Sequence, residues 1–184
     1  MLFTDDTDEA LRAAVDLVNS AEPPESLVLE EFLARHPYTG RIDRDKAELS
    51  ALRELRPRLR ELLLARRDDM AVGVNRALAD VDLAPRLTRH DGADWHLHAV
   101  ADDHPLPERI LIETAMALID VIRADEGSRI TVCADAECQA IALDLTRNRS
   151  KRYCSTACAN RNAVAAYRAR QAREAVSADP RPTR

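Results

Sequence analysis

The sequence Cys133-Ala-Asp-Ala-Glu-Cys138, followed after fifteen residues by Cys154-Ser-Thr-Ala-Cys158, contains all four cysteines of this 184-residue chain. The cysteines form two close pairs. In such a pattern each pair supplies two thiolates from one local turn, and the fold brings the two pairs together around a tetrahedral Zn²⁺. The spacing therefore predicts one structural zinc ion, bound by Cys133, Cys138, Cys154 and Cys158.

Other interpretations of the four cysteines fit the sequence less well. Two disulfides would need an oxidising compartment, and the first residues have neither the basic region nor the long apolar run of an export signal. An iron–sulfur cluster also takes four thiolates, but the spacing matches neither ferredoxin pattern. Four unrelated buried cysteines would not normally cluster in this way.

The sequence gives no indication of an enzyme. Four cysteine ligands leave a zinc ion no open position for water, so catalysis at this site is not expected. We find no nucleophile–base pair, and four glycines in the whole chain leave little from which to build a phosphate-binding loop. We predict a binding protein.

The residues around the cysteines predict a local architecture. The apolar run 130–132 precedes the first pair, which indicates a zinc knuckle at the end of a strand. Ser155 follows Cys154 and can cap a helix that carries Cys158 in its first turn and runs to about residue 175. The amides at a helix N-terminus also favour the negative charge of a thiolate. A knuckle followed by ligands at a helix start is a treble-clef-like arrangement.

Residues 133–170 resemble the CGNR zinc finger, a small bacterial module. The resemblance rests on the cysteine spacing and on three flanking segments, which read Asp144-Leu-Thr-Arg147-Asn148, Tyr153-Cys154-Ser155 and Cys158-Ala159-Asn160-Arg161. The sequence departs from the family pattern at three positions. Ala159 replaces the glycine of the family name, Tyr153 stands where tryptophan is usual, and Ala142 stands where phenylalanine is common. Because alanine forms helices better than glycine does, the first departure should leave the site intact.

The first part of the chain predicts a helical body. Hydrophobic residues make up 46% of the chain and aromatic residues only 3%, so its core must consist mainly of aliphatic side chains. We expect helices at 6–20, capped by Asp6, and at 26–35 after a break at Pro23 and Pro24. A longer helix begins at Asp43 or Asp45 with a kink near Pro57, and a weaker one covers 70–83. The expected apolar stripes are Leu11, Val15 and Val18; Leu29, Phe32 and Leu33; and Leu52, Leu55, Leu59, Leu62 and Leu63.

The pattern then changes to that of a hairpin. Segments 86–90 and 94–100 flank Asp91-Gly92, a strong hairpin signal. Trp95, Leu97 and Ala99 would share one face, with His96 and His98 on the other. Two such histidines can hold a metal, but they more often form the wetter face of a strand. A fifth helix follows Pro105 and Pro107 and ends at Gly127, with Leu111, Ala115, Leu118, Ile119 and Ile122 facing inward.

These elements predict a mainly α fold with a small β-hairpin (α+β). We divide it into a helical domain over 1–127 with a hairpin near 86–100, a zinc finger over 128–176, and a disordered tail over 177–184. Residues 5–126 are expected to fold without zinc, because their leucine-rich stripes can bury a core unaided. The segment Asp16-Leu-Val-Asn19-Ser20 resembles a motif near the start of the ABATE domain, which commonly precedes CGNR fingers. That family is described as stress-induced transcriptional regulators, which implies DNA binding by the finger.

The charge distribution agrees with that implication. From Arg147 onward the chain has ten Lys or Arg residues against two Asp or Glu residues, a net charge of +8, whereas the remainder carries −13. A basic end on an acidic body indicates an anionic partner. We therefore predict a zinc-finger DNA-binding regulator; the alternative is a zinc-stabilised protein-interaction module. The predicted DNA contacts are Arg147, Arg149, Lys151, Arg152, Asn160, Arg161, Arg168 and Arg170.

The sequence alone leaves two questions open. Asn160 and Arg161 can either contact DNA or hydrogen-bond the zinc loop and hold its shape. The acidic body can serve as a sensor for a small-molecule effector, as a platform for a homodimer, or as both. No stretch of the sequence approaches the length of a membrane span, so we expect a soluble cytoplasmic protein without a membrane partner.

Overall fold

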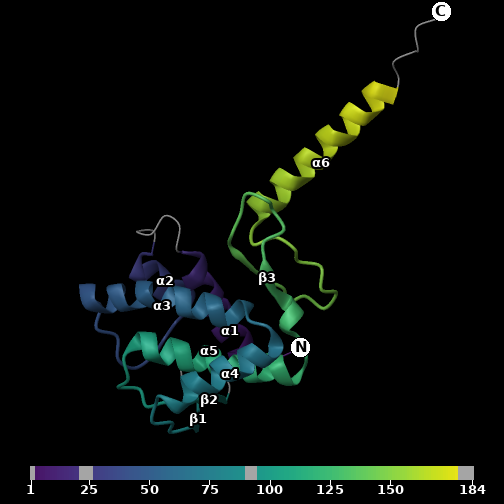
Figure 1. Ribbon diagram of the computed structural model, residues 1–184. Helices are drawn as coiled ribbons and strands as arrows, with labels where there is room; N and C mark the ends of the chain where they lie inside the picture. The colour runs from purple at the N-terminus through teal and green to yellow at the C-terminus, as the bar shows by residue number, and fades with distance from the viewer. Residues whose placement is uncertain (1–2, 21–26, 90–94, 178–184) are drawn as a thin grey trace, which may run out of the picture.

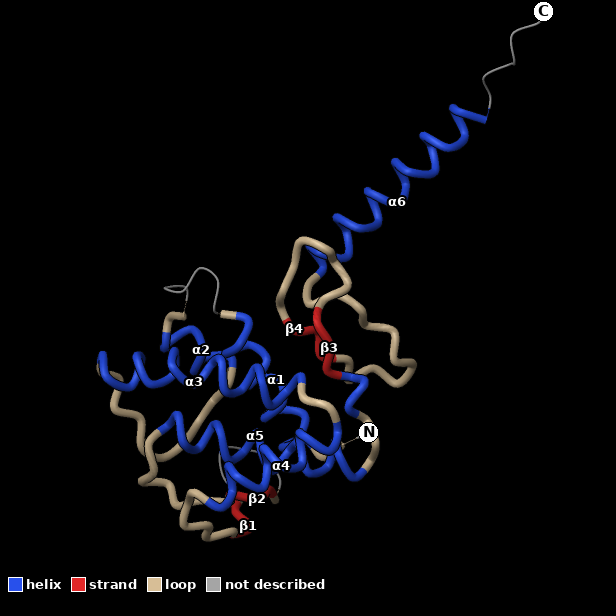
Figure 2. The backbone as a smooth tube through the Cα atoms, in the orientation of Figure 1, coloured by secondary structure: helices blue, strands red, loops and turns tan. Residues whose placement is uncertain are grey.

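The computed structural model describes residues 3–20, 27–89 and 95–177. Helices dominate, and two short antiparallel hairpins accompany them (Figure 2). The elements in chain order are α1 Asp5–Asn19, α2 Leu29–Arg35, α3 Lys46–Leu64, α4 Arg67–Ala79, β1 Arg86–Thr88, β2 His96–His98, α5 Leu106–Arg123, the 3-10 turn η2 Gly127–Arg129, β3 Ile130–Val132, β4 Ile141–Leu143 and α6 Thr156–Ser177. The predicted α+β class is confirmed.

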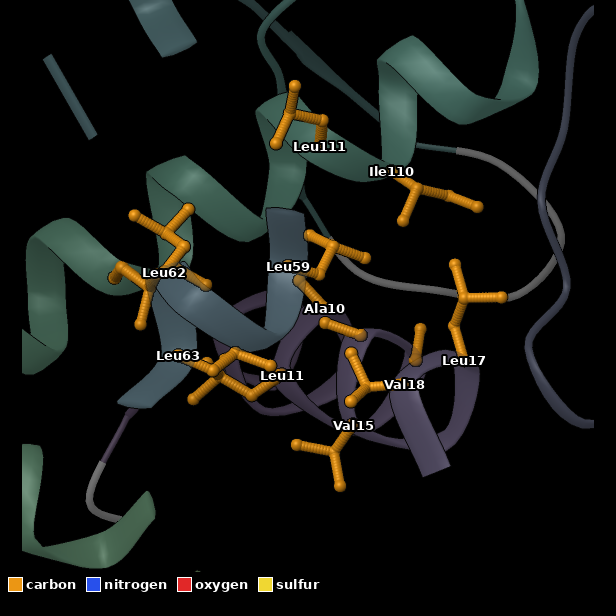
Figure 3. Packing of buried hydrophobic residues seen from close by; sticks show 14 of the residues in the cluster. Ala10, Leu11, Val15, Leu17, Val18, Leu59, Leu62, Leu63, Ile110 and Leu111 are labelled. Carbon is orange, nitrogen blue, oxygen red and sulfur yellow. The ribbon is translucent and has the colours of Figure 1, made fainter. Parts of the chain in front are cut away.

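The core of the body is built around α5, which contacts α1, α3 and α4. Apolar residues recur on one side of each of these helices, because a spacing of three or four residues places them on the same face. Figure 3 shows residues of α1, α3 and α5 converging on one cluster. Most of the predicted apolar stripes are buried, and Leu55, Ile119 and Ile122 are partly buried against them.

Several predicted helix limits were wrong. The first helix begins at Asp5, with Thr4 rather than Asp6 at its N-cap. The second begins at Leu29, and the fourth covers Arg67–Ala79 instead of 70–83. The expected cap of the third helix is confirmed at Asp45, whose carboxylate accepts a hydrogen bond from the backbone N–H of Glu48 at 2.8 Å. The predicted features at Pro23, Pro24, Ser26, Asp91-Gly92 and 178–184 lie outside the described residues.

The fifth helix ends before Gly127. Its last residue is Arg123, and the chain turns at Asp125, which has a positive φ of 56°. Aspartate tolerates this left-handed conformation better than most residues, because its short polar side chain can hydrogen-bond locally. Gly127 instead begins η2, which leads directly into β3.

The first hairpin has the opposite exposure from the one predicted. Leu87 pairs with Leu97 across β1 and β2, and both are exposed, as is Trp95. The histidine face is the less exposed one: the rings of His96 and His98 lie against each other, and the His98 side chain is only 12% exposed. The reason is that the body holds this hairpin through Ala99 and Val100, which follow β2 and pack against Ile112 of α5.

The second hairpin joins the C-terminal part of the chain to the body. Strands β3 and β4 pair antiparallel, and β4 was not predicted from the sequence. Ile130, Ile141 and Leu143 belong to the same buried cluster as the body helices. The second hairpin of the C-terminal part therefore extends the core of the body.

The segment Asp16–Ser20 lies at this junction. The side-chain amide of Asn19 donates to the carbonyl oxygen of Ile141 at 2.9 Å and accepts from the Ile141 N–H at 2.7 Å. One asparagine of α1 thus satisfies both backbone groups of a β4 residue. Asp16, one turn earlier, accepts hydrogen bonds from His36 at 2.9 Å and from Arg35 at 3.1 Å, which fasten the end of α2 to α1. The hydrogen bond from His36 is the largest cause that lowers the pKa of Asp16.

Helix α6 extends away from the body and the second hairpin (Figure 1). The first hairpin, β1 and β2, lies at the opposite end of the molecule. Within the described part of the chain, no helix is both long enough and apolar enough to cross a membrane.

Candidate metal centre

The four cysteines come from three neighbouring pieces of the C-terminal part. Cys133 directly follows β3, and Cys138 lies in the connection from β3 to β4. Cys154 precedes α6, and Cys158 lies in its first turn. The hydroxyl oxygen of Ser155 accepts a hydrogen bond from the Cys158 N–H at 3.3 Å, which confirms the predicted cap. The strand, knuckle and helix start therefore occur in the predicted order.

The cysteine sulfurs fit a tetrahedral metal site. All four Sγ atoms lie within 4.8 Å of one another. The Sγ of Cys154 is 3.6 Å from that of Cys138 and 3.7 Å from that of Cys158. Zn–S bonds of about 2.3 Å in a tetrahedron place the sulfurs about 3.8 Å apart, close to these two distances, so zinc fits after movements of no more than about 1 Å. The four cysteines form a single structural zinc site.

The protein also supplies hydrogen-bond donors to the sulfurs. The backbone N–H of Cys154 donates to the Sγ of Cys133 at 3.4 Å, and the guanidinium of Arg161 donates to the Sγ of Cys158 at 3.3 Å. Without metal, burial and the neighbouring thiols raise the pKa of Cys154 to about 12. A cation therefore makes it possible for all four sulfurs to ionise together at neutral pH.

Arg161 connects the two halves of the metal centre. Its guanidinium forms an ion pair with the carboxylate of Asp135, with nitrogen–oxygen distances of 2.5 and 2.7 Å. Asp135 lies in the knuckle between the first two cysteines, is 4% exposed, and also accepts from the N–H of Glu137. The hydrogen bond from Arg161 is the largest cause that lowers the pKa of Asp135. Of the two roles that the sequence left open for Arg161, these contacts favour that of bracing the zinc loop.

We expect Arg161→Ala to lower zinc affinity by roughly 10- to 100-fold, the usual cost of losing a group that orients metal ligands. The variant loses both the hydrogen bond to Cys158 and the ion pair that holds the knuckle, and it leaves the buried carboxylate of Asp135 without its cation. Competition with a chromogenic chelator measures the affinity. Arg168→Ala, at an exposed arginine two turns along the same helix, is the matched control. Equal affinities in the two variants would contradict the bracing role.

The predicted DNA contacts occupy two surfaces of the C-terminal part. The loop between β4 and α6 carries Arg147, Arg149, Lys151 and Arg152, and α6 carries Asn160, Arg161, Arg168 and Arg170. All eight residues are exposed. Arg149, which has a positive φ of 49°, is already paired with Glu126 at 2.7 Å. The structure thus leaves six of the eight without a carboxylate partner among the described residues.

The loop is held in place by two buried charged residues. The carboxylate of Asp144 accepts from the N–H of Lys151 at 2.8 Å and from the N–H and hydroxyl of Thr146. Arg129 donates to the carbonyl oxygens of Asp144 and Thr146 and pairs with Glu126. A cavity of about 270 Å³ opens between this loop and β3, and four basic residues line it: Arg129, Arg149, Lys151 and Arg152. The loop therefore presents its basic side chains from a fixed backbone.

Three residues that hold the C-terminal part in place were not predicted from the sequence. Asp135 lies between two predicted ligands, Cys133 and Cys138, and this position could have indicated that it supports the metal site. Asn19 belongs to the motif Asp16–Ser20, but it contacts a strand 122 residues away in sequence. Local patterns in the sequence do not indicate such a distant contact. Glu126, which holds both Arg129 and Arg149, comes directly before the predicted helix stop.

Two family models match the chain. One, described as "CGNR zinc finger", matches residues 129–171. The other, the ABATE model, described as "Putative stress-induced transcription regulator", matches residues 11–125. No curated protein matches the chain.

Proposed function

This chain belongs to the ABATE family and carries a CGNR zinc finger, and from that premise we propose that it is a transcriptional regulator that binds duplex DNA through the finger. Zinc has a structural role in this proposal. The helical body serves as a sensing or dimerisation unit. Both family resemblances seen in the sequence are confirmed by the matches.

One observation carries the proposal: the basic residues gather at one end of the chain, on the loop before α6 and along α6 itself. The finger and the segment after it carry +8 on a chain whose remainder carries −13. A duplex has one phosphate charge for about every 1.7 Å of its axis, so a basic surface of this kind gains affinity by releasing counterions. The acidic body is repelled by the same phosphates, which directs DNA to the finger end.

The shape of this part supports a duplex as the partner. The described residues of α6 contain four arginines and one acidic residue, Glu174, and almost all of their side chains are exposed up to that point. An α-helix fits the major groove of B-DNA, which is about 12 Å wide. Lys151 and Arg152 come shortly before this helix in the chain and can contact the phosphates beside the groove.

Binding to a mixed-sequence duplex of about 30 base pairs, measured by fluorescence anisotropy at several salt concentrations, tests this function. If four to six basic side chains contact phosphates, log affinity should fall with log salt at a slope of about −4 to −5. We expect Arg168→Glu combined with Arg170→Glu to abolish binding, because the change replaces two phosphate contacts by repulsion. The zinc content should not change, since neither side chain touches the metal site.

The matched control carries the same change of net charge on the body. Arg58→Glu combined with Arg76→Glu alters two exposed arginines of α3 and α4. This variant should keep most of the affinity of the wild type. If the α6 variant binds as well as the control, or if wild-type affinity does not depend on salt, the finger is a protein-docking module instead.

A further inference from the structure

Helix α6 lacks a packing partner over most of its length. From Asn160 to Glu174 its described side chains are exposed, apart from the half-buried Asn162, and the helix extends into solvent (Figure 1). Two of the exposed residues are large and apolar: Val164 is 49% exposed and Tyr167 is 56% exposed. Single exposed apolar residues are common on protein surfaces, so what matters here is the face of the helix on which these two lie.

These two residues lie on one face together with two amides. Successive residues of an α-helix are rotated by about 100°, because the helix has 3.6 residues per turn. Asn160, Val164, Tyr167 and Gln171 therefore fall within an arc of about 60°. We name this set the α6 strip. None of these four residues is charged, although arginine is the commonest polar residue of the helix. Glu174, at the C-terminal end of the same face, lies about 50° from the centre of the strip.

Arginines flank the α6 strip on both sides. By the same rotation, Arg168 lies about 70° from the centre of the strip on one side, and Arg170 lies about 90° from it on the other. The guanidinium carbon of Arg170 is 6.0 Å from the centre of the Tyr167 ring, which holds this arginine close to the edge of the strip. Arg161, on the side of Arg168, is paired with Asp135. Arg173 lies near the back of the helix.

We propose that α6 enters the major groove with the α6 strip toward the base edges, so that Asn160 and Gln171 read bases while Arg168 and Arg170 bind phosphates of opposite strands. This inference rests on the proposed function. Asn and Gln side chains make paired hydrogen bonds to adenine N6 and N7, and an apolar side chain such as Val164 contacts the methyl group of thymine. The chemistry of the strip thus favours A·T base pairs.

A second copy of the chain is a less suitable partner for this face. A pair of helices needs apolar residues repeated every seven residues at two positions of each heptad. If Val164 and Tyr167 occupy the two apolar positions of one heptad, the preceding position is Asn160 and the next two are Gln171 and Glu174. All three of these residues are polar. The apolar seam is therefore one heptad long. The flanking arginines of two such helices would also repel each other.

Selection from a randomised duplex pool, followed by affinity measurements, separates base readout from phosphate contact. The wild type should enrich a preferred sequence containing A·T pairs. Asn160→Ala and Gln171→Ala should each reduce the affinity ratio of preferred to scrambled duplex by about 5- to 150-fold. Arg168→Gln and Arg170→Gln should weaken binding to both duplexes alike, each making the salt slope shallower by about 1. Arg173→Gln, on the back of the helix, should change neither quantity by a comparable amount.

The outcomes distinguish this inference from the proposed function. If the wild type shows no salt-dependent affinity for any duplex, the proposed function fails and the inference fails with it. If the wild type binds DNA, but the two amide variants keep its sequence preference, the inference alone is wrong. Sedimentation velocity gives a further criterion: a wild-type dimer that Tyr167→Glu dissociates would assign the strip to a second copy.

Discussion

Cys158→Ser is expected to lose the zinc ion and to unfold the C-terminal part of the chain. Cys158 is buried in the first turn of α6, and its sulfur accepts a hydrogen bond from Arg161. Serine at this position removes that sulfur. Metal binding to a structural zinc site contributes folding free energy, about 10–16 kcal/mol in small zinc-finger peptides at neutral pH. Elemental analysis of protein purified without chelator should give one zinc per chain for the wild type and a value near zero for the variant.

The effect should extend beyond the finger. Ile130, Ile141 and Leu143 belong to the core of the body. They lie on β3 and β4, and the connection between these two strands carries the zinc ligands Cys133 and Cys138. We therefore expect Cys158→Ser to lower the melting temperature of the helical body as well. Chelation of the wild type should have the same effect, and added zinc should reverse it.

Ala159→Gly is the matched control, since it alters the next residue and restores the residue usual in this family. Ala159 lies within α6 and is not among the described residues with positive φ. Glycine at an interior helix position costs about 1 kcal/mol relative to alanine, so this variant should lose little stability and no zinc. A wild type with four free thiols and no metal, or a Cys158→Ser variant that keeps its zinc, would contradict the proposed coordination.

The sequence predicted the metal site better than its attachment to the body. The four ligands, the cap at Ser155 and the helix after it follow from local spacing, because each pair of cysteines lies within one turn. The hairpin partner β4 was missed, since a strand of three residues, Ile-Ala-Leu, is too short to show a periodicity of two. The ion pair of Arg161 with Asp135 joins residues 26 apart in sequence, and no local pattern indicates it.

The errors in the body have a similar origin. Apolar periodicity identified the buried faces of α1, α3 and α5, where the stripes are long. It failed at β1 and β2, where alternation suggested that Trp95 and Leu97 face inward. The body holds that hairpin through Ala99 and Val100 instead, so tertiary attachment overrode the local pattern. The end of α5 was misplaced because Asp125 takes the left-handed conformation for which Gly127 was the expected residue.

A chain that ends after Gly127 should still fold, but with a clear loss of stability. The sequence predicts an independent body, whereas the structure places Ile130, Ile141 and Leu143 in the same cluster as the residues of α1, α3 and α5. Burying one such side chain contributes about 1.5–3 kcal/mol. If the truncated body exposes an area similar to that of these three side chains, its free energy of unfolding falls by about 4.5–9 kcal/mol. For a domain of this size we expect its melting temperature to fall by roughly 15–40 °C.

Asn19→Ala in the full chain separates the polar part of this attachment from the apolar part. The variant removes both hydrogen bonds to the backbone of Ile141 and leaves a partly buried N–H and C=O unpaired, at a cost of about 1–3 kcal/mol. In the truncated chain the same substitution should have little effect, because Asn19 then has no β4 to bind. A difference between the two backgrounds measures the coupling between α1 and the finger.

Four proteins are compared: the full chain, the truncated chain, and Asn19→Ala in each of them. Their thermal unfolding is followed by circular dichroism at 222 nm, with and without chelator. The truncated chain should be helical, unfold cooperatively and show no response to the chelator, since its residues include no cysteine. The full chain should start at a higher melting temperature and fall toward that of the truncated chain when zinc is removed. Equal melting temperatures for the full and truncated chains would mean that the shared cluster adds no stability and that residues 1–127 form an independent domain. A truncated chain without a cooperative transition would mean that α1, α3, α4 and α5 cannot close their core unless β3 and β4 cover it.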